Sequence, residues 1–296
     1  MKLLLDQLEQ GARVLIVRIR SMGDCVLTTP ALQLLAAHRP DLRIGVVVEE
    51  RFAEIYSGLP FVHEILPPVA AAARRFGPKL CVNLHGGSRS TVISATCGAR
   101  YRTGFGHYRN QFVYNVKLPR AQEVLGEERT VHTAEHVASA MFYLGVPRNL
   151  PIPRAMLSAA PSPPRSGYYA VVHPFASSTD KTWPAANFVA AARAIREQHG
   201  LDPVILAGPG DDVTPFEGFE VWAAKPLADV KTLIRHSSFF LGNDSGPAHI
   251  AAAFDIPLTV VFGPSNPEIW GPWRASKARI LKASEPAAPE LAVAAL

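Results

Sequence analysis

Short apolar runs alternate with longer helix-like segments along the whole chain. Most of these runs are rich in β-branched residues and apolar on both faces, as strands buried inside a parallel sheet are. The predicted strands are Val14–Val17, Ile44–Val48, Leu80–Asn83, Ala170–His173, Val204–Ala207, Phe239–Leu241 and Leu258–Phe262. The Ala- and Leu-rich stretches between them predict helices, among them Pro30–His38, Ala134–Leu144, Ala185–His199 and Ala248–Phe254. This alternation indicates βαβ units and doubly wound α/β sheets.

One segment interrupts the alternation near the middle of the chain. Residues 145–167, GVPRNLPIPRAMLSAAPSPPRSG, hold six prolines and little periodicity, which is typical of a linker. A strand pattern resumes at YYAVVHP, and 296 residues suit two domains of roughly 150 residues each. We therefore expect two Rossmann-like domains, over residues 1–160 and 161–296, that face each other across a ligand-binding cleft. Neither a GxGxxG after the first strand nor a GxxxxGK[ST] is present, which counts against dinucleotide oxidoreductases and P-loop enzymes.

The composition narrows the class of protein. Apolar residues make up 48% of the chain and charged residues 19%, so a sizeable core is expected and a disordered chain is excluded. Cys25, Cys81 and Cys97 lack CxxC spacing, which argues against a disulfide scaffold or thiolate zinc site and favours a reducing cytosol. The first apolar run is short and is followed by Asp6 and Glu9, unlike a signal peptide. With no apolar stretch near the roughly 20 residues of a membrane span, we expect a cytoplasmic protein.

The net charge of +5 and the pI of about 9.2 favour an anionic partner. Nucleic acid, an anionic lipid surface and a phosphorylated small molecule all satisfy this condition. Because the positive charges are dispersed and not interleaved with aromatic residues, nucleic acid is the weakest of the three. We expect no nucleic-acid partner.

The first candidate loop follows the first predicted strand, in LIVRIRSMGDCVLTTPALQLL. Gly23 is interpreted as a turn residue that lets the chain present Asp24. Asp24 has two interpretations: it caps the following helix, or it is a carboxylate placed for chemistry at the end of a strand. The stretch alone leaves both open.

The second candidate loop, HPFASSTDKTWP, follows the first strand of the second half. Ser177, Ser178 and Thr179 supply hydroxyl groups and Lys181 a compact positive charge, a combination that suits the oxygens of a diphosphate. The alternative is a solvated lysine in a polar surface loop.

The third candidate loop lies in FLGNDSGPAHIAAAF. Asn243 to Gly246 lead into a helix begun near Pro247, and the exposed N–H groups and dipole of a helix start attract anions. The alternative is an ordinary helix start capped by Asp244 or Ser245. This second anion-compatible loop in the same half makes coincidence less probable.

Two histidines have the spacing of metal ligands but not their context. His132 and His136 lie four residues apart on a predicted helix with Glu135 between them, yet the motif is not HExxH and no third ligand is evident. A solvated or partly buried helix face is the favoured interpretation. The sequence also has no Asp-x-Asp, so we expect no metal at the phosphates.

Several segments together resemble one enzyme family. The stretches RSMGDCVLTTPAL, DKTWP, NLHGGSRSTVISATCGARYRTGF and GNDSGPAHIAAAFDIPLTVVFGPSNPEIWGPW are similar to signatures of glycosyltransferase family 9, the ADP-heptose:lipopolysaccharide heptosyltransferases. The resemblance covers about residues 13–275 and implies an α/β GT-B fold, with an acceptor-binding domain first and a nucleotide-sugar-binding domain second. The tail after Ser284 departs from the family pattern, because it is rich in alanine and proline.

The resemblance also implies roles for individual residues. Asp24 matches the general base and Lys181 the lysine that contacts the donor phosphates. The donor-binding turn and helix match Asp244, Ser245, Gly246, Pro247 and His249. The implied reaction is a single displacement with inversion, in which the nucleotide sugar, expected to be ADP-heptose, is a substrate and no cofactor takes part.

A set of basic residues in the first half is a candidate acceptor site. Arg89, Arg100, Arg102 and Arg109 are interpreted as contacts for phosphate or carboxylate groups of a glycolipid, or else as plain surface arginines. We expect a cytoplasmic enzyme that is peripheral at the cytoplasmic face of the inner membrane. Two alternatives stay open: a GT-B transferase for another nucleoside-diphosphate sugar, and an inactive nucleotide-sugar-binding homologue. Asp24 together with Lys181 counts against the second.

Overall fold

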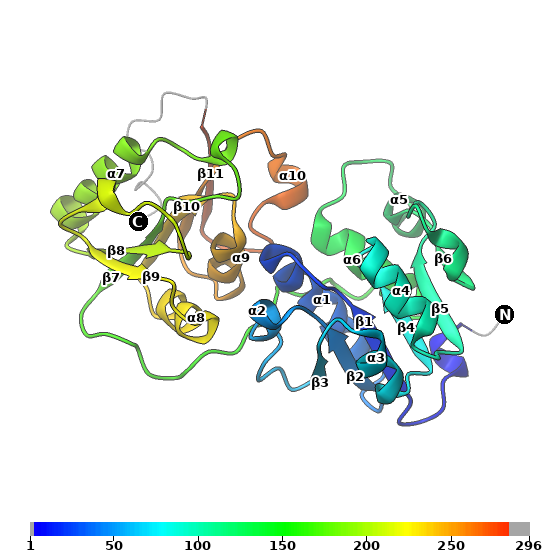
Figure 1. The fold of residues 1–296 in the computed structure, drawn as a ribbon. Helices are drawn as coiled ribbons and strands as arrows, with labels where there is room; N and C mark the ends of the chain where they lie inside the picture. The colour runs from blue at the N-terminus through cyan, green and yellow to red at the C-terminus, as the bar shows by residue number, and fades with distance from the viewer. Residues whose placement is uncertain (1–2, 284–296) are drawn as a thin grey trace. The chain divides into compact units, whose positions relative to one another are not determined.

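The computed structural model describes residues 3–283, so the tail after Ser284 lies outside the described residues. The chain divides into two compact units, residues 1–158 (unit 1) and 159–296 (unit 2), each built around one parallel sheet (Figure 1). The division falls inside the proline-rich stretch, two residues before the expected boundary at 160/161. The two units are described in turn.

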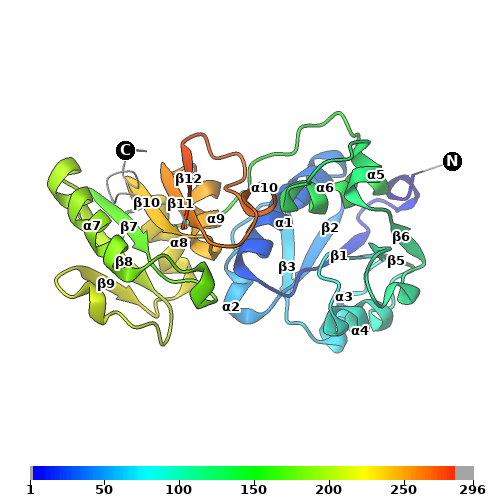
Figure 2. The same ribbon diagram turned by 90° about the horizontal axis from the view of Figure 1, so that it is seen from above.

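Unit 1 contains a six-stranded sheet in the order β3-β2-β1-β4-β5-β6. Its strands are β1 (Arg13–Val17), β2 (Arg43–Val47), β3 (Val62–Leu66), β4 (Leu80–Asn83), β5 (Tyr101–Phe105) and β6 (Val116–Leu118). Its helices are η1 (Leu5–Gln7), α1 (Met22–His38), α2 (Glu50–Ala53), α3 (Ala70–Phe76), α4 (Ser88–Thr96), η2 (Gln111–Val113), α5 (Ala121–Leu125) and α6 (Thr133–Leu144). Figure 2 shows α1 and α6 on one side of this sheet and α3 and α4 on the other.

Unit 2 repeats the arrangement with the strand order β12-β11-β10-β7-β8-β9. Its strands are β7 (Tyr169–His173), β8 (Asp202–Ala207), β9 (Glu220–Ala223), β10 (Phe239–Asn243), β11 (Leu258–Phe262) and β12 (Ala278–Lys282). Its helices are η3 (Thr179–Lys181), α7 (Ala185–His199), η4 (Thr214–Phe216), α8 (Leu227–Arg235), α9 (Gly246–Ala253) and α10 (Pro267–Trp270). Counted from the start of each unit, the two sheets have the same strand order. The first and fourth strands are neighbours in both, so each unit has a topological switch point between them.

The strands predicted from the sequence are all present, and the α/β fold class is confirmed. Four of the strands that the pattern missed are edge strands, such as β3 with the sequence VHEIL and β9 with EVWA, and both have exposed polar positions. The fifth, β5, lies between β4 and β6, and its sequence YRTGF is not a continuous apolar run. Helix α1 begins at Met22, well before the predicted start at Pro30. A proline removes the N–H that would bond to the carbonyl four residues earlier, here Val26, and the Thr29 hydroxyl donates to that carbonyl at 2.9 Å instead.

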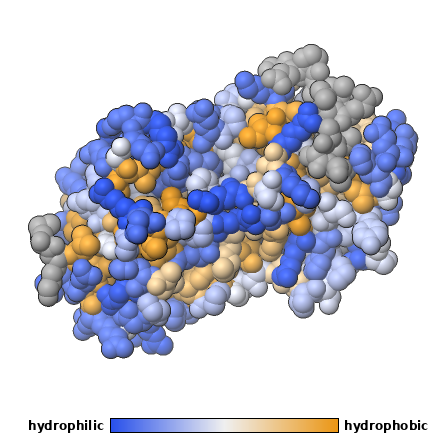
Figure 3. All heavy atoms as spheres, turned by 180° about the vertical axis from the view of Figure 1, so that it is seen from behind, coloured by the Kyte–Doolittle hydropathy of each residue, from blue (hydrophilic) through white to orange (hydrophobic). Residues whose placement is uncertain are grey.

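The surface is mixed in character. Hydrophilic and hydrophobic residues are interspersed over the face shown in Figure 3. None of the helices formed by residues 3–283 combines the length and apolarity needed to cross a bilayer.

Candidate functional site

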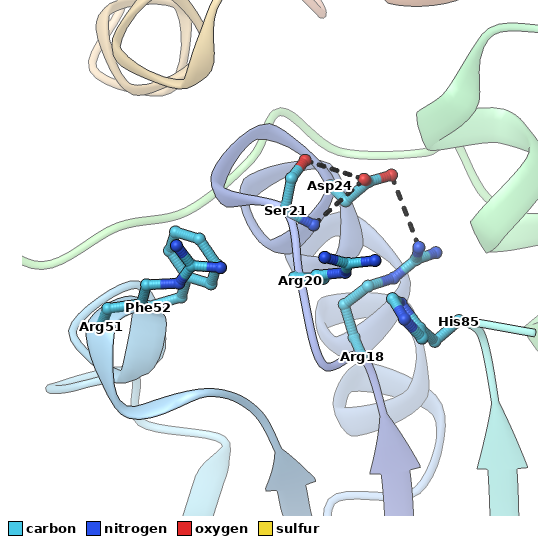
Figure 4. Close-up of a pocket in the computed structure, with 7 residues that line it drawn as sticks. All are labelled: Arg18, Arg20, Ser21, Asp24, Arg51, Phe52 and His85. Carbon is cyan, nitrogen blue, oxygen red and sulfur yellow. Dashed lines mark hydrogen bonds and ion pairs between the residues drawn. The ribbon is translucent and has the colours of Figure 1, made fainter. Parts of the chain in front are cut away.

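Asp24 is held at the start of α1, directly after the carboxyl end of β1. One carboxylate oxygen, Oδ2, accepts hydrogen bonds from the Ser21 backbone N–H at 3.2 Å and from the Ser21 hydroxyl at 2.9 Å. The other oxygen, Oδ1, lies 3.4 Å from Arg18 Nη1 (Figure 4). The two interpretations of this residue therefore combine, because one oxygen caps the helix while Asp24 still lines a pocket. Gly23 lies in the first turn of α1 without a positive φ, so the turn itself is made by residues 18–21.

The pocket beside Asp24 has a volume of about 530 Å³ and is rich in guanidinium groups. It is lined by Arg18, Arg20, Ser21, Asp24, Arg51, Phe52 and His85 (Figure 4). Arg51 pairs with Glu49 at 2.8 Å and lies over the Phe52 ring at 4.6 Å. Arg18 is only 7% exposed, and its Nε has no hydrogen-bond partner among the described residues. Cations outnumber carboxylates around this space, which suits an anionic ligand group.

His85 is fixed at the pocket by a buried asparagine. Asn83, the last residue of β4, accepts hydrogen bonds from the backbone N–H groups of His85 at 3.0 Å and Gly86 at 3.1 Å. Its amide nitrogen donates to the hydroxyls of Ser90 and Tyr114. Burial and the nearby Arg18 guanidinium lower the pKa of His85, which favours the neutral imidazole.

Motif analysis did not single out Arg18, Arg20, Arg51 or His85. Their position in the fold identifies them, because they follow the carboxyl ends of β1, β2 and β4. In parallel sheets, ligands bind at that edge and near the switch point.

The arginines expected to contact an acceptor lie elsewhere. Arg100 and Arg102 flank the amino end of β5, whereas Asp24 follows the carboxyl end of a strand parallel to it. Arg102 donates hydrogen bonds to the carbonyls of Val113 and Ala99. The structure thus does not bring these two side chains together with Asp24. Arg89, in the first turn of α4, donates to the Pro68 carbonyl at 2.9 Å, and Arg109 is exposed after β5.

Unit 2 gathers its candidate loops around a second buried asparagine. Asn243 ends β10, which occupies the same place in its sheet as β4 in unit 1. Its Oδ1 accepts a hydrogen bond from the Trp183 backbone N–H at 3.0 Å, and its Nδ2 donates to the Pro174 carbonyl at 2.8 Å. These two bonds hold both ends of the loop that carries Lys181.

Lys181 and Asp244 lie close enough to influence each other. Burial raises the pKa of Asp244, while the Ser265 hydroxyl bonded to its carboxyl group and the Lys181 ammonium nearby act in the opposite direction. The loop after β11 approaches from the other side, since a Cβ on Gly263 would lie 2.7 Å from the Asp180 carbonyl oxygen. Three loops at strand ends therefore meet around Lys181, as the sequence predicted for two of them.

The other predicted donor-binding residues surround the same loops. Ser177, Ser178 and Thr179 are exposed, and the Ser178 carbonyl accepts a bond from Thr182 that tightens the turn. Helix α9 begins at Gly246 with Pro247 in its first turn and His249 buried one turn in. The Ser245 hydroxyl is buried with no hydrogen-bond partner among residues 3–283. It is placed at the helix start, where it can receive a ligand oxygen.

The two histidines with ligand spacing have structural roles. His132 caps α6 by accepting a hydrogen bond from the Ala134 N–H at 3.1 Å, and Glu135 pairs with Arg129 at 2.8 Å. His136 stacks on Phe105 with ring centroids 4.1 Å apart. Within the described part of the chain, no three His, Cys, Asp or Glu side chains are placed to hold a metal ion.

Comparison with known proteins adds relatives over most of the chain. Lipopolysaccharide heptosyltransferase 3 of Escherichia coli is 26% identical over 294 residues, covering 86% of this chain and 84% of that protein. Lipopolysaccharide heptosyltransferase 1 of E. coli K12 is 26% identical over 290 residues, covering 88% and 90%. The solved structure of E. coli heptosyltransferase WaaC with ADP has a TM-score of 0.77 at 22% identity, covering 94% of this chain and 97% of that one.

The chain is also similar to the solved structure of the iron-containing dodecameric glycosyltransferase TibC from enterotoxigenic E. coli. Its TM-score is 0.62 at 18% identity, and the match covers 92% of this chain and 62% of TibC. The side chains of residues 3–283 do not fit a metal site.

The family follows from these matches and the fold. Residues 78–294 match the model of glycosyltransferase family 9 (heptosyltransferase), which is most of the chain. The two six-stranded Rossmann-like sheets are those of the GT-B heptosyltransferases. The chain belongs to glycosyltransferase family 9, the heptosyltransferases, and is a glycosyltransferase.

Proposed function

We propose that the enzyme transfers a heptose from ADP-heptose to a hydroxyl of a lipopolysaccharide core acceptor, with inversion at the anomeric carbon. The relatives named as lipopolysaccharide heptosyltransferases support the acceptor class. Solved structures of the family described with ADP and with ADP-2-deoxy-2-fluoro heptose support the donor. The enzyme would act in the cytoplasm, at the inner membrane surface where such an acceptor is presented.

The position of Asp24 carries this proposal. An acceptor hydroxyl is a poor nucleophile until a base within hydrogen-bond reach accepts its proton. Ser21 holds Oδ2 of Asp24 and thereby orients the carboxylate, while Oδ1 shares the pocket with Arg18. As the acceptor oxygen bonds to the anomeric carbon, its proton passes to Asp24 and the bond from that carbon to the diphosphate breaks.

Unit 2 would hold the donor and its leaving group. Negative charge grows on the departing nucleoside diphosphate as the sugar–oxygen bond breaks. The Lys181 ammonium and the N-terminus of α9 at Ser245 and Gly246 supply positive charge and donors for those oxygens. Asp244, beside Lys181, is placed to accept hydrogen bonds from sugar hydroxyls.

The arginine-lined pocket indicates what accompanies the acceptor hydroxyl. Arg18, Arg20 and Arg51 surround the base, and guanidinium groups pair with carboxylates and phosphates in bidentate fashion. We infer that the sugar that receives the heptose bears an acidic group close to its reactive hydroxyl.

The test compares Asp24→Asn with Asp6→Asn, a matched change at an exposed carboxylate. Asp24→Asn should lower kcat about 10²- to 10⁴-fold, because the amide accepts no proton. Thermal stabilisation by ADP should stay at the wild-type level in both variants, because the proposed donor-binding residues belong to unit 2. Near-normal turnover by Asp24→Asn would refute the assignment of the base. Stabilisation by UDP, GDP or CDP but not by ADP would identify a transferase for a different nucleotide sugar.

A further inference from the structure

One long stretch of unit 1 contains no carboxylate side chain. Residues 65–122 include no Asp or Glu, and the stretch alone carries +9, more than the +5 of the whole chain. Its cations are Arg74, Arg75, Lys79, Arg89, Arg100, Arg102, Arg109, Lys117 and Arg120. A run of this length without a negative charge is unusual for a globular domain, in which charges of both signs are normally interspersed.

The topology places the helices of this stretch on one side of the sheet. The connections from β3 to β4 and from β4 to β5 both run toward β6, and right-handed crossovers put their helices on the same side. That side carries α3 and α4, with η2 packed beside α4, whereas α1 and α6 cover the other side (Figure 2). We call the outer surface of α3, α4, η2 and their flanking loops the α3–α4 face.

An exposed apolar side chain lies in or directly beside each of α3, α4 and η2 on the α3–α4 face. Val69 directly precedes α3 and is 46% exposed, Val92 on α4 is 56% exposed, and Phe112 in η2 is 78% exposed. The same elements and the loops beside them also carry exposed arginines. Within residues 3–283 none of these arginines forms an ion pair with a carboxylate: Arg74, Arg75, Arg89, Arg100 and Arg109. The face thus combines protruding apolar side chains with unneutralised positive charge.

We propose that the α3–α4 face docks unit 1 onto an anionic lipid bilayer. Arginines attract a surface of anionic headgroups, and apolar side chains such as Phe112 enter the boundary between headgroups and acyl chains. A nucleic acid would suit the charge but not the apolar side chains, because single-strand binders present several aromatic rings along a groove. The inference rests on the proposed function for its purpose, since a lipopolysaccharide acceptor is embedded in a membrane.

The docked face lies next to the acceptor pocket within unit 1. Helix α4 begins at Ser88, three residues after His85, which lines the pocket beside Asp24. Arg89 stands in the first turn of that helix. A bilayer bound along α4 and η2 would therefore hold the pocket near the headgroups, where the core sugars of a glycolipid begin.

The experiment measures co-sedimentation of the full chain with phosphatidylcholine vesicles that contain or lack phosphatidylglycerol. The double variant R109Q/F112S removes one arginine and the most exposed apolar ring of the α3–α4 face. Its matched control is R148Q/Y143S, which removes an exposed arginine and a 40% exposed tyrosine at α6, on the other side of the sheet.

Wild type and control should bind the anionic vesicles, and binding should weaken as salt rises. The loss of one arginine near an anionic surface weakens binding about fivefold. Because R109Q/F112S also loses the Phe112 ring, its binding should weaken by more than that. Equal losses in both variants, or equal binding to neutral vesicles, would overturn the proposal. The proposal would also be overturned if the wild type bound a labelled RNA oligonucleotide but not the vesicles, and if R109Q/F112S abolished that RNA binding. Because the assay needs no turnover, its failure is distinguishable from failure of the proposed reaction.

Discussion

Asn243 allows a quantitative test of how the loops proposed to bind the donor are held. Its side chain is fully buried, and each end of its amide bonds to a backbone group in the loop between β7 and α7. Asn243→Ala would leave the Trp183 N–H and the Pro174 carbonyl without partners. Both residues are buried, so water does not readily replace the lost bonds.

The size of the effect follows from those two groups. An unsatisfied buried backbone group costs about 1–3 kcal/mol, so the variant should lose about 4 kcal/mol of unfolding free energy. This is a large fraction of the 5–15 kcal/mol typical of a domain and corresponds to a fall in Tm of about 10 °C. Release of the loop also adds an ordering cost to ligand binding, so ADP affinity should fall about tenfold or more.

A second asparagine provides the control. Asn115 also bridges two backbone groups, donating to the Arg100 carbonyl and accepting from the Arg102 N–H, both at 2.8 Å, but it is exposed. Water can replace these bonds, so Asn115→Ala should cost about 1 kcal/mol or less. Urea unfolding gives the free energies, and calorimetric titration gives the ADP affinity. Losses in Asn243→Ala and Asn115→Ala that agree within about 0.5 kcal/mol would refute the reasoning.

Two further changes test other contacts. Gly263→Ala places a Cβ 2.7 Å from the Asp180 carbonyl oxygen and 3.0 Å from Lys181 Cα, so the loop must move and ADP binding should weaken by about 1–3 kcal/mol in calorimetry. Wild-type ADP affinity in that variant would contradict the packing. Burial, together with the nearby His107 and Arg18, lowers the pKa of His136 to about 4. The folded protein therefore holds this imidazole neutral, and the resulting stability is present above pH 6.5 and is lost as the pH falls toward 4. Urea unfolding of wild type should show a loss of about 2 kcal/mol from this residue between pH 7 and pH 5, and His136→Phe, which keeps a ring against Phe105, should remove it. Equal pH dependence of the two proteins would contradict this.

The buried strands were predictable because both of their faces are apolar. All five residues of β10 and all five of β11 are buried. Short apolar runs of this kind are typical of strands inside a parallel sheet. Outer strands such as β3 and β12 lack that signal, since half of their positions meet solvent. Helix α1 runs through Pro30 because the Thr29 hydroxyl satisfies the carbonyl that the proline leaves open.

The candidate site was predictable only in part. Asp24 and Lys181 stand in motifs, and the structure places each at the end of a central strand of its unit. Arg18 and Arg51 belong to no motif, and they meet Asp24 only because β1 and β2 end at one edge of the sheet. Arg100 and Arg102 lie at the amino end of β5, at the edge of the sheet opposite Asp24, which their position along the chain does not reveal. Bonds such as that from Asn243 to Pro174 join residues 69 positions apart and depend on the tertiary fold.

The repeated strand order of the two units has a consequence for how the family can diversify. Each half carries its own set of loops after the carboxyl ends of its strands: residues 18–24, 49–52 and 85–87 in unit 1, and residues 174–184, 243–246 and 263–266 in unit 2. Under the proposed function, mutations that change the choice of acceptor can therefore accumulate in the first set while the second remains under selection for one donor. Exchanging the first set between homologues is accordingly the natural design for making chimaeric transferases that decorate new glycans from an unchanged sugar supply.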